Sequence, residues 1–139
     1  MAEPRGEPVI STLRRVHLFS DCGDEELALV ESLLSRVEVD ADAALLRQGE
    51  PGRHFFVITH GYARVRRDRT DLGVVGPGSF VGEMALLHAT TTSAAVTAIT
   101  PLTAYVIDRQ QFQLVIDRVP SIDDKVRQTA AQRASENGA

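Results

Sequence analysis

Between residues 35 and 107 the sequence predicts short strands separated by tight turns, and this pattern limits the possible folds more than any other feature. Stretches in which apolar and polar residues alternate, such as Arg36 to Asp40 and Tyr62 to Arg67, are separated by turns such as Gly76-Pro77-Gly78. Short strands with regular spacing are typical of an antiparallel barrel or roll. The expected strands cover residues 36–40, 44–48, 54–59, 62–67, 72–75, 93–99 and 102–107.

A helical period flanks these strands on both sides. Before them, the sequence predicts a short helix that ends near Phe19 and a second helix capped by Asp24. After them, it predicts a helix from Arg109 to Val119 and a final helix at about residues 121–135, capped by Ser121. The predicted fold class is mainly β with flanking helices: a jelly-roll-like antiparallel β-roll (double-stranded β-helix) with N-terminal helices and two C-terminal helices.

The final helix has a thin apolar face, made of Ile122, Val126, Ala130 and Ala134. A stripe this narrow rarely holds a helix in place unaided. We therefore expect a protein partner for this helix, either a second copy of the chain or a downstream domain.

The length and composition indicate one globular domain. The chain has 139 residues, of which 43% are hydrophobic and 24% charged, both near the average for a protein with a single core. We expect residues 1–8 to form a flexible N-terminal tail and residues 9–139 to form the domain. Because Cys22 is the only cysteine, a secreted scaffold held by disulfides is excluded.

The charge and hydropathy argue against nucleic-acid and membrane partners. The net charge is -4, whereas nucleic-acid-binding domains are usually basic, and we expect no helix-turn-helix reader after Pro120. No apolar run approaches the roughly 18 residues that cross a bilayer, and no signal peptide is evident, so we expect a cytoplasmic protein. One group of arginines is best interpreted as a solvated hairpin edge, with contact to phosphate or an acidic partner as the lesser alternative. This group contains Arg64, Arg66, Arg67 and Arg69, with Arg14 and Arg15.

No catalytic or metal-binding constellation is evident. The four histidines, at positions 17, 54, 60 and 88, lack metal-ligand spacing, so a cupin, a similar β-roll that binds metal through histidines, is the weaker interpretation. Cys22 lies among acidic residues, which raise the pKa of a thiol and reduce its reactivity. We therefore predict no enzymatic activity, no required cofactor and no metal site.

The segment from Gly76 to Leu87 interrupts the strands with a different pattern. Its glycines let the backbone approach a ligand, and residues 83–87 have the composition of one helical turn, whose first N–H groups can face an anion. Glu83 at that start can accept hydrogen bonds from ligand hydroxyls. Taken alone, the same pattern also fits a tight turn followed by a glutamate that complements the helix dipole.

From about Leu13 to Val126 the chain resembles the cyclic nucleotide-binding domains of bacterial catabolite-activator proteins and of the regulatory subunits of the cAMP-dependent kinase. The resemblance implies a regulatory module with cAMP or cGMP as its effector. Its fold would be a β-roll whose C-terminal helices move when the ligand binds. The matching segments are 18–20, 46–52, 56–61, 76–78, 82–87 and 93–96.

The resemblance also implies a ligand site in residues 82–93, which we call the cassette. The family's glutamate, which holds the ribose 2′-hydroxyl, matches Glu83. The N–H groups of Met84 and Ala85 would face the cyclic phosphate, and Ser93 matches a position that often touches it. The candidate ligand-binding residues are Gly82, Glu83, Met84, Ala85, Thr92, Ser93 and Ala94.

The cassette departs from the family at its most diagnostic position. The family has an arginine that pairs with the phosphate, whereas this chain has Thr92, and Thr91 replaces the usual preceding proline. A guanidinium offers a fixed fork of donors and a full charge, while a hydroxyl offers one donor and no charge. We expect roughly ten- to a hundredfold weaker binding of a phosphate ligand, unless a nearby group such as His88 or Arg47 compensates.

Two functional hypotheses therefore remain open. The first is a sensor of cAMP or a related nucleotide that relays binding to the C-terminal helices. The second is a degenerate family member that no longer binds cyclic nucleotide and acts as a protein–protein interaction module.

Overall fold

The computed structural model describes residues 13–136. The predicted tail, residues 1–8, and the start of the first expected helix lie outside this range. The expected strands and helices within it are present, with shifted boundaries. The helical elements are the 3₁₀ helix η1 (His17–Phe19), α2 (Asp24–Leu33), α3 (Glu83–His88), α4 (Arg109–Arg118) and α5 (Pro120–Glu136).

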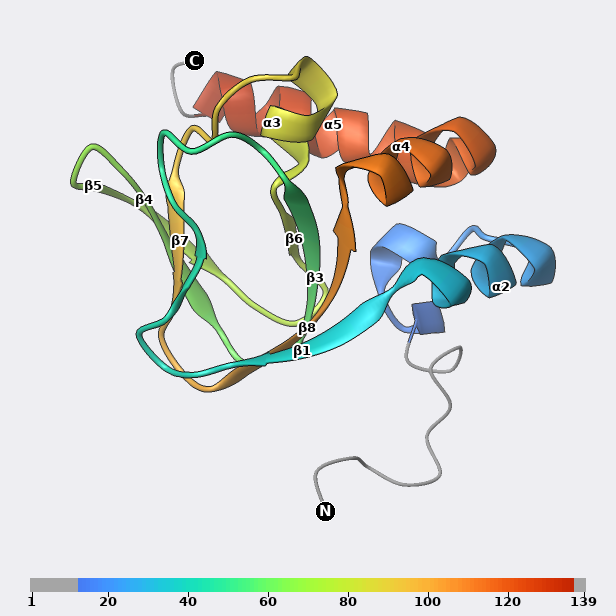
Figure 1. The fold of residues 1–139 in the computed structure, drawn as a ribbon, viewed down its shortest axis with the longest axis horizontal. Coiled ribbons are helices and arrows are strands. Elements are labelled where there is room, and N and C mark those ends of the chain that lie inside the picture. The colour runs from blue at the N-terminus through green and yellow to red at the C-terminus, as the bar shows by residue number, and fades with distance from the viewer. Residues whose placement is uncertain (1–12, 137–139) are drawn as a thin grey trace.

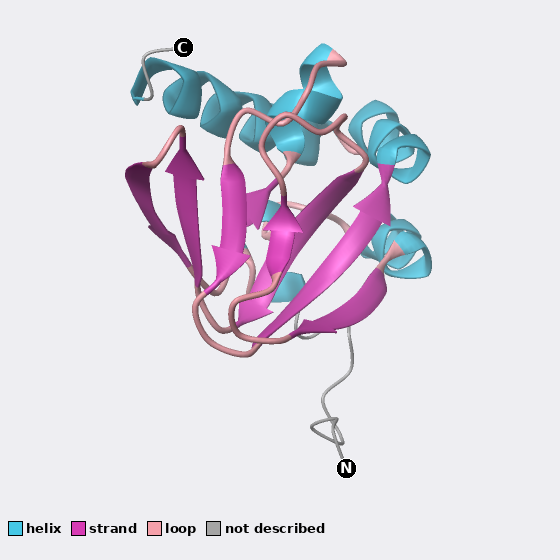
Figure 2. Ribbon diagram, turned by 60° about the vertical axis from the view of Figure 1, so that its left-hand side comes forward, coloured by secondary structure: helices cyan, strands magenta, loops and turns pink. Residues whose placement is uncertain are grey.

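The strands form two antiparallel four-stranded sheets that face each other as a roll (Figure 2). One sheet has the order β1-β8-β3-β6 and the other β2-β7-β4-β5. Because both sheets are antiparallel and helices flank them, the predicted β-roll fold is confirmed. The strand bounds are β1 Ser35–Val39, β2 Ala44–Leu46, β3 His54–His60, β4 Ala63–Arg67, β5 Thr70–Val75, β6 Phe80–Val81, β7 Ala95–Ala98 and β8 Leu102–Asp108.

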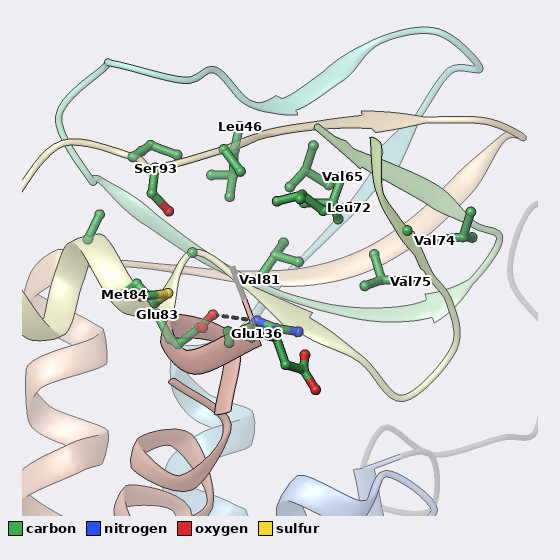
Figure 3. A pocket seen from close by; sticks show the side chains of 17 residues that line it. Leu46, Val65, Leu72, Val74, Val75, Val81, Glu83, Met84, Ser93 and Glu136 are labelled. Carbon is green, nitrogen blue, oxygen red and sulfur yellow. Dashed lines mark hydrogen bonds and ion pairs between the residues drawn. The ribbon is translucent and has the colours of Figure 1, made fainter. Parts of the chain in front are cut away.

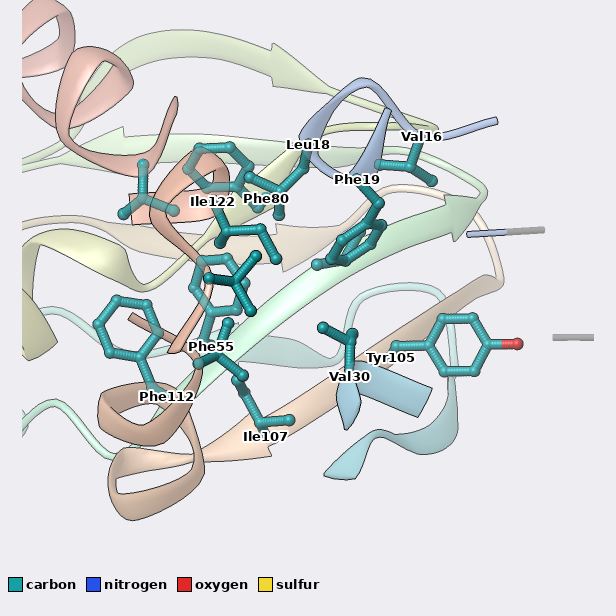
Figure 4. Packing of buried hydrophobic residues seen from close by; sticks show 14 of the residues in the cluster. Val16, Leu18, Phe19, Val30, Phe55, Phe80, Tyr105, Ile107, Phe112 and Ile122 are labelled. Atoms are coloured by element: carbon teal, nitrogen blue, oxygen red, sulfur yellow. The ribbon is translucent and has the colours of Figure 1, made fainter. Parts of the chain in front are cut away.

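Strand β3 is apolar along most of its length because both of its faces are buried. Phe55 and Val57 belong to a core between the first sheet and the helices, and Ile58 belongs to a second core inside the roll. In the first core, the Phe55 ring lies 5.4 Å from that of Phe80 and 5.1 Å from that of Phe112 on α4 (Figure 4). The cores thus attach the C-terminal helices to the sheet that leads into the cassette.

Helices α3, α4 and α5 lie together at one end of the roll (Figure 1). Helix α5 contacts α4, η1 and α3, so the last helix of the chain reaches back to the first described element and to the cassette. Its buried side chains are Ile122, Val126 and Ala130, three of the four residues of the predicted stripe. None of the helices within residues 13–136 combines the length and hydropathy that a membrane span requires.

Two predicted helix caps are wrong. Gly23, not Asp24, precedes α2 as its cap residue, with extended backbone and an N–H that donates to Glu26 Oε1 over 2.9 Å. Helix α5 begins at Pro120, because proline's fixed φ suits a first helical turn and its missing N–H has no partner there. Ser121 therefore lies inside the helix.

Candidate ligand pocket

A pocket of about 220 Å³ opens between the cassette, the second sheet and the end of α5 (Figure 3). Aliphatic side chains such as Leu46, Val65 and Leu72 form one wall, and Glu83 of the cassette lies opposite. The seven residues singled out from the sequence all line it: Gly82, Glu83, Met84, Ala85, Thr92, Ser93 and Ala94. The structure thus brings them together, while their role in binding stays a prediction.

The turn at Gly82 positions Glu83 in this pocket. Gly82 has φ +99°, and a Cβ there would lie 2.3 Å from the carbonyl oxygen of His54. Only glycine combines that conformation with such a close approach to β3. Helix α3 begins directly afterwards, which aims the Glu83 side chain inward from the first turn.

A second close approach fixes the other side of the cassette. A Cβ on Gly52 would lie 2.4 Å from Ala85 Cβ, so the loop before β3 packs directly on α3. The same loop pairs with the chain around Thr92, whose N–H donates to the Glu50 carbonyl over 2.8 Å. The Thr92 carbonyl in turn accepts from the Gly49 N–H, also over 2.8 Å. Because its N–H is engaged in this way, the only donor that Thr92 can offer a ligand is its side-chain hydroxyl.

Two polar residues are buried within residues 13–136, and both line this pocket. Glu83 is 1% exposed and Thr92 is 8% exposed. A buried carboxylate requires a partner, and the Glu83 Oε1 atom accepts a hydrogen bond of 2.8 Å from Nη1 of Arg133 on α5 (dashed line in Figure 3). This ion pair therefore joins the cassette to the last helix.

Arg133 was not predicted from the sequence. It is separated from Glu83 by 50 residues, so no local spacing links the two. A signal did exist: Arg133 follows Val126 and Ala130 at i+7 and i+3, on the apolar face that docks α5. The two residues suggested as compensating cations, Arg47 and His88, do not line the pocket.

Outside this pocket, the groups of interest among the described residues are potential metal ligands and Cys22. Within residues 13–136 no group of three or more His, Cys, Asp or Glu side chains could hold a metal ion. Cys22 belongs to the core between the first sheet and the helices, away from the pocket. Burial is the main cause that raises the pKa of its thiol, while the acidic residues Glu26 and Asp21 add to it. The sequence correctly predicted that the pKa of Cys22 is raised, but the acidic residues expected to raise it contribute less than burial does.

The comparison with protein families shows which family the chain belongs to. The model of the cyclic nucleotide-binding domain matches residues 36–119, more than half of the chain, so the chain belongs to this family. A cGMP-dependent protein kinase of Caenorhabditis briggsae is 30% identical over 95 residues, which make up 68% of this chain. They make up only 13% of the kinase, so the chain spans a small part of that relative. Domains of this family are regulatory modules.

Solved structures show the same fold. The regulatory subunit of a cAMP-independent protein kinase A from Trypanosoma brucei superposes with a TM-score of 0.84 at 23% identity, covering 92% of this chain and 46% of that chain. A variant of that protein with three substitutions, one of them threonine to arginine, is bound to cAMP in its A site. It superposes with a TM-score of 0.80 at 24% identity, covering 89% and 46%. The catabolite activator protein of Thermus thermophilus gives 0.75 at 25% identity, covering 87% and 59%.

Proposed function

We propose that this chain is a non-catalytic regulatory domain that senses cAMP or cGMP through its cassette, residues 82–93, and relays binding to the C-terminal helices. One observation carries the proposal: the buried carboxylate of Glu83 lines a pocket of about 220 Å³ within a member of the cyclic nucleotide-binding family. The pair with Arg133 offsets the cost of burying this charge, and a carboxylate that lines a pocket is suited to accept hydrogen bonds from ribose hydroxyls.

The remaining pocket residues suit the other parts of such a ligand. We assign the ribose 2′-hydroxyl to Glu83 and the cyclic phosphate to the N–H groups of Met84 and Ala85, with the Ser93 hydroxyl beside them. The aliphatic wall, which includes Leu46, Val65 and Leu72, offers an apolar surface to the base. The family resemblance predicts the contacts of Glu83, Met84, Ala85 and Ser93, and these residues line the same pocket as the aliphatic wall.

Phosphate binding is expected to be weak at Thr92. A hydrogen bond to a charged group contributes about 1.5–3 kcal/mol, and the threonine hydroxyl supplies neither the charge nor the forked geometry of a guanidinium. The affinity should be roughly ten- to a hundredfold lower than with arginine at this position. The trypanosomal regulatory subunit offers a parallel, because its variant bound to cAMP carries a threonine-to-arginine substitution.

The relay depends on α5. This helix contacts both the cassette helix α3 and helix α4, so a change in the pocket alters surfaces on which α5 rests. A ligand shifts such a helix only if it binds one helix position better than the other. We expect any partner, a second copy or a downstream domain, to respond to α5.

A second candidate function has its own supporting observation. Because Arg133 already occupies Oε1 of Glu83, the pocket resembles one that is filled by its own side chain. In that case the domain would act through protein contacts, with the ion pair holding α5 in a fixed position.

Isothermal titration calorimetry with cAMP and cGMP decides between these functions. A dissociation constant below about 100 μM for either ligand supports the sensor, and flat titrations favour the second candidate.

The companion variant is Thr92→Arg, for which we expect cAMP affinity at least roughly tenfold higher. Thr91→Arg is its matched control, because it adds the same charge at an exposed residue that does not line the pocket. Equal gains in both variants would indicate a general charge effect and contradict the assigned role of position 92.

A further inference from the structure

Arg133 is the one cation among the described residues that line the pocket. It comes from the last helix, α5, and not from the cassette. Two other arginines of the C-terminal helices are engaged elsewhere: Arg109 donates to the Gly52 carbonyl, and Arg127 pairs with Asp123. Any anionic group that enters the pocket therefore meets the charge of Arg133.

The guanidinium of Arg133 is held in place from two sides. Its Nη1 atom donates to Glu83 Oε1 over 2.8 Å, and its Cζ atom lies 5.3 Å from the ring centroid of Phe80. The side chain is nevertheless 26% exposed, whereas that of Glu83 is 2% exposed. A group fixed in this way loses little conformational entropy when a ligand binds, and it still has a surface to offer.

The ion pair with Glu83 does not exhaust the donors of Arg133. A guanidinium has five N–H donors in a rigid fork, and the bond to Glu83 uses one of its nitrogens. The remaining donors suit a phosphate, which arginine binds with two parallel hydrogen bonds. One residue can thus bridge the carboxylate that takes the ribose and the anion attached to that ribose.

We propose that Arg133 recognises the ligand's phosphate and so takes the place of the arginine that is missing at position 92. This inference rests on the proposed function. It assigns the phosphate contact to helix α5, so the ligand binds directly to the helix that relays the signal. Glu136 also lines the pocket, and its negative charge repels an anion. This side chain is exposed, however, and its Oε2 atom accepts a hydrogen bond from Gln132.

The test compares cAMP binding by calorimetry in the wild-type chain, in Arg133→Gln and in Arg127→Gln. We expect Arg133→Gln to bind cAMP at least roughly tenfold more weakly, because one charge-assisted contact is lost. Arg127→Gln removes the same charge from the same helix, at a residue that does not line the pocket, and should bind like the wild type. Equal or tighter binding by Arg133→Gln would overturn the inference and show that the arginine only blocks Glu83.

A double variant that moves the positive charge from one position to another makes the test specific for that charge. In the double variant Thr92→Arg/Arg133→Gln the positive charge returns to the position where the family has it. We expect cAMP affinity to recover to at least the wild-type level, which shows that Arg133→Gln lost a cation and not the pocket. Failure to recover in a double variant that has a native circular-dichroism spectrum would contradict the assigned role.

Should Arg133→Gln fail to fold, the wild-type chain still provides the test. Adenosine shares the base and ribose of cAMP but has no phosphate. We expect cAMP to bind at least roughly tenfold more tightly than adenosine, and this advantage to shrink as salt is raised. Equal affinities would overturn the inference, because no cation would then act on the phosphate.

The failures of the two proposals are distinguishable. Flat wild-type titrations with cAMP and cGMP overturn the proposed function and this inference together. Wild-type binding that Arg133→Gln leaves unchanged overturns only the role of Arg133.

Discussion

At the scale of single residues, glycines shape the pocket and two buried polar side chains define its chemistry. Gly82 turns the chain so that Glu83 enters the pocket, and Gly52 lets the preceding loop rest on Ala85. Neither glycine contributes a side chain to ligand binding. Their effect is on the positions of Glu83 and Thr92, so substitutions at them should alter stability and binding together.

Gly82→Ala should lower the free energy of unfolding by about 1–3 kcal/mol or more, because φ is +99° and the new Cβ would lie 2.3 Å from the His54 carbonyl oxygen. Gly78→Ala is the matched control: its φ is +90°, but no atom lies within 4 Å of the added Cβ. Urea unfolding measures both. Equal losses would mean that backbone conformation alone matters and that the close approach to β3 does not.

The residues at the start of the cassette were predictable from the sequence because their spacing is local. The local pattern of glycines and a helical turn points to Gly82 and Glu83, whereas Thr92 was singled out only through the family resemblance. Arg133 was not predictable in this way. Its place in the pocket depends on the angle at which α5 crosses the cassette, which follows from the packing of Ile122 and Val126 and from no local motif.

At the scale of elements, the C-terminal helices are attached to the roll by unequal contacts. Helix α4 buries Phe112, Val115 and Ile116 against the first sheet. Helix α5 is attached firmly near its beginning and only weakly beyond Ala130, the last of its fully buried residues. Its end therefore depends on Arg133.

Phe112→Ala should destabilise the fold by about 3–5 kcal/mol, because the ring is 2% exposed and lies 5.1 Å from that of Phe55. Chemical denaturation measures this loss. Ile99→Ala, at a residue that is 39% exposed, should cost less than about 1 kcal/mol. Comparable losses in the two variants would contradict the position assigned to the core between α4 and β3.

Arg133→Gln should speed hydrogen exchange of the amides in residues 131–136 by roughly tenfold or more, since the ion pair with Glu83 and the contact with Phe80 are both lost. Exchange in residues 122–126 should change less, because these residues are held by the core. The control Arg127→Gln breaks only an exposed i,i+4 pair, which contributes about 0.3–0.5 kcal/mol. Unchanged exchange at the end of α5 would show that Arg133 does not anchor it.

The boundaries of these helices could be predicted only in part. The 3.6-residue period of α4 is strong, and its start is reinforced by the cap residue Asp108, whose side chain accepts from the Gln111 N–H over 2.8 Å. The start of α5 was missed by one or two residues, because Pro120 reads equally well as the stop of one helix and the first residue of the next. The packing of Val119 and Ile122 in the core decides that Pro120 begins α5 and does not merely end α4.

At the scale of the whole molecule, two hydrophobic cores hold different parts of the fold together. The core inside the roll holds the two sheets together, and the core under the helices attaches α2, α4 and α5 to the first sheet. The composition predicted a single core, and the division into two was not predicted; it arises because a strand such as β3, apolar on both faces, is covered on both sides. The depth of the pocket could not be predicted, since it depends on how α5 closes one end of the roll.

Cys22 offers a probe of the intact molecule. It belongs to the core under the helices, and burial raises the pKa of its thiol, so less of the reactive thiolate is present near neutral pH. Alkylation of the native protein should be at least roughly tenfold slower than in urea. Fast alkylation without denaturant would indicate that η1 and α2 open easily, in contrast to the packing described.

The central claim, that the cassette is a cyclic nucleotide site, is tested most directly by titrating ¹⁵N-labelled protein with cAMP and following the backbone amide resonances. We predict saturable shifts of the amides of Met84, Ala85 and Ser93, together with those near Arg133. Absence of shifts up to millimolar cAMP, or shifts confined to residues outside the pocket, would contradict the account.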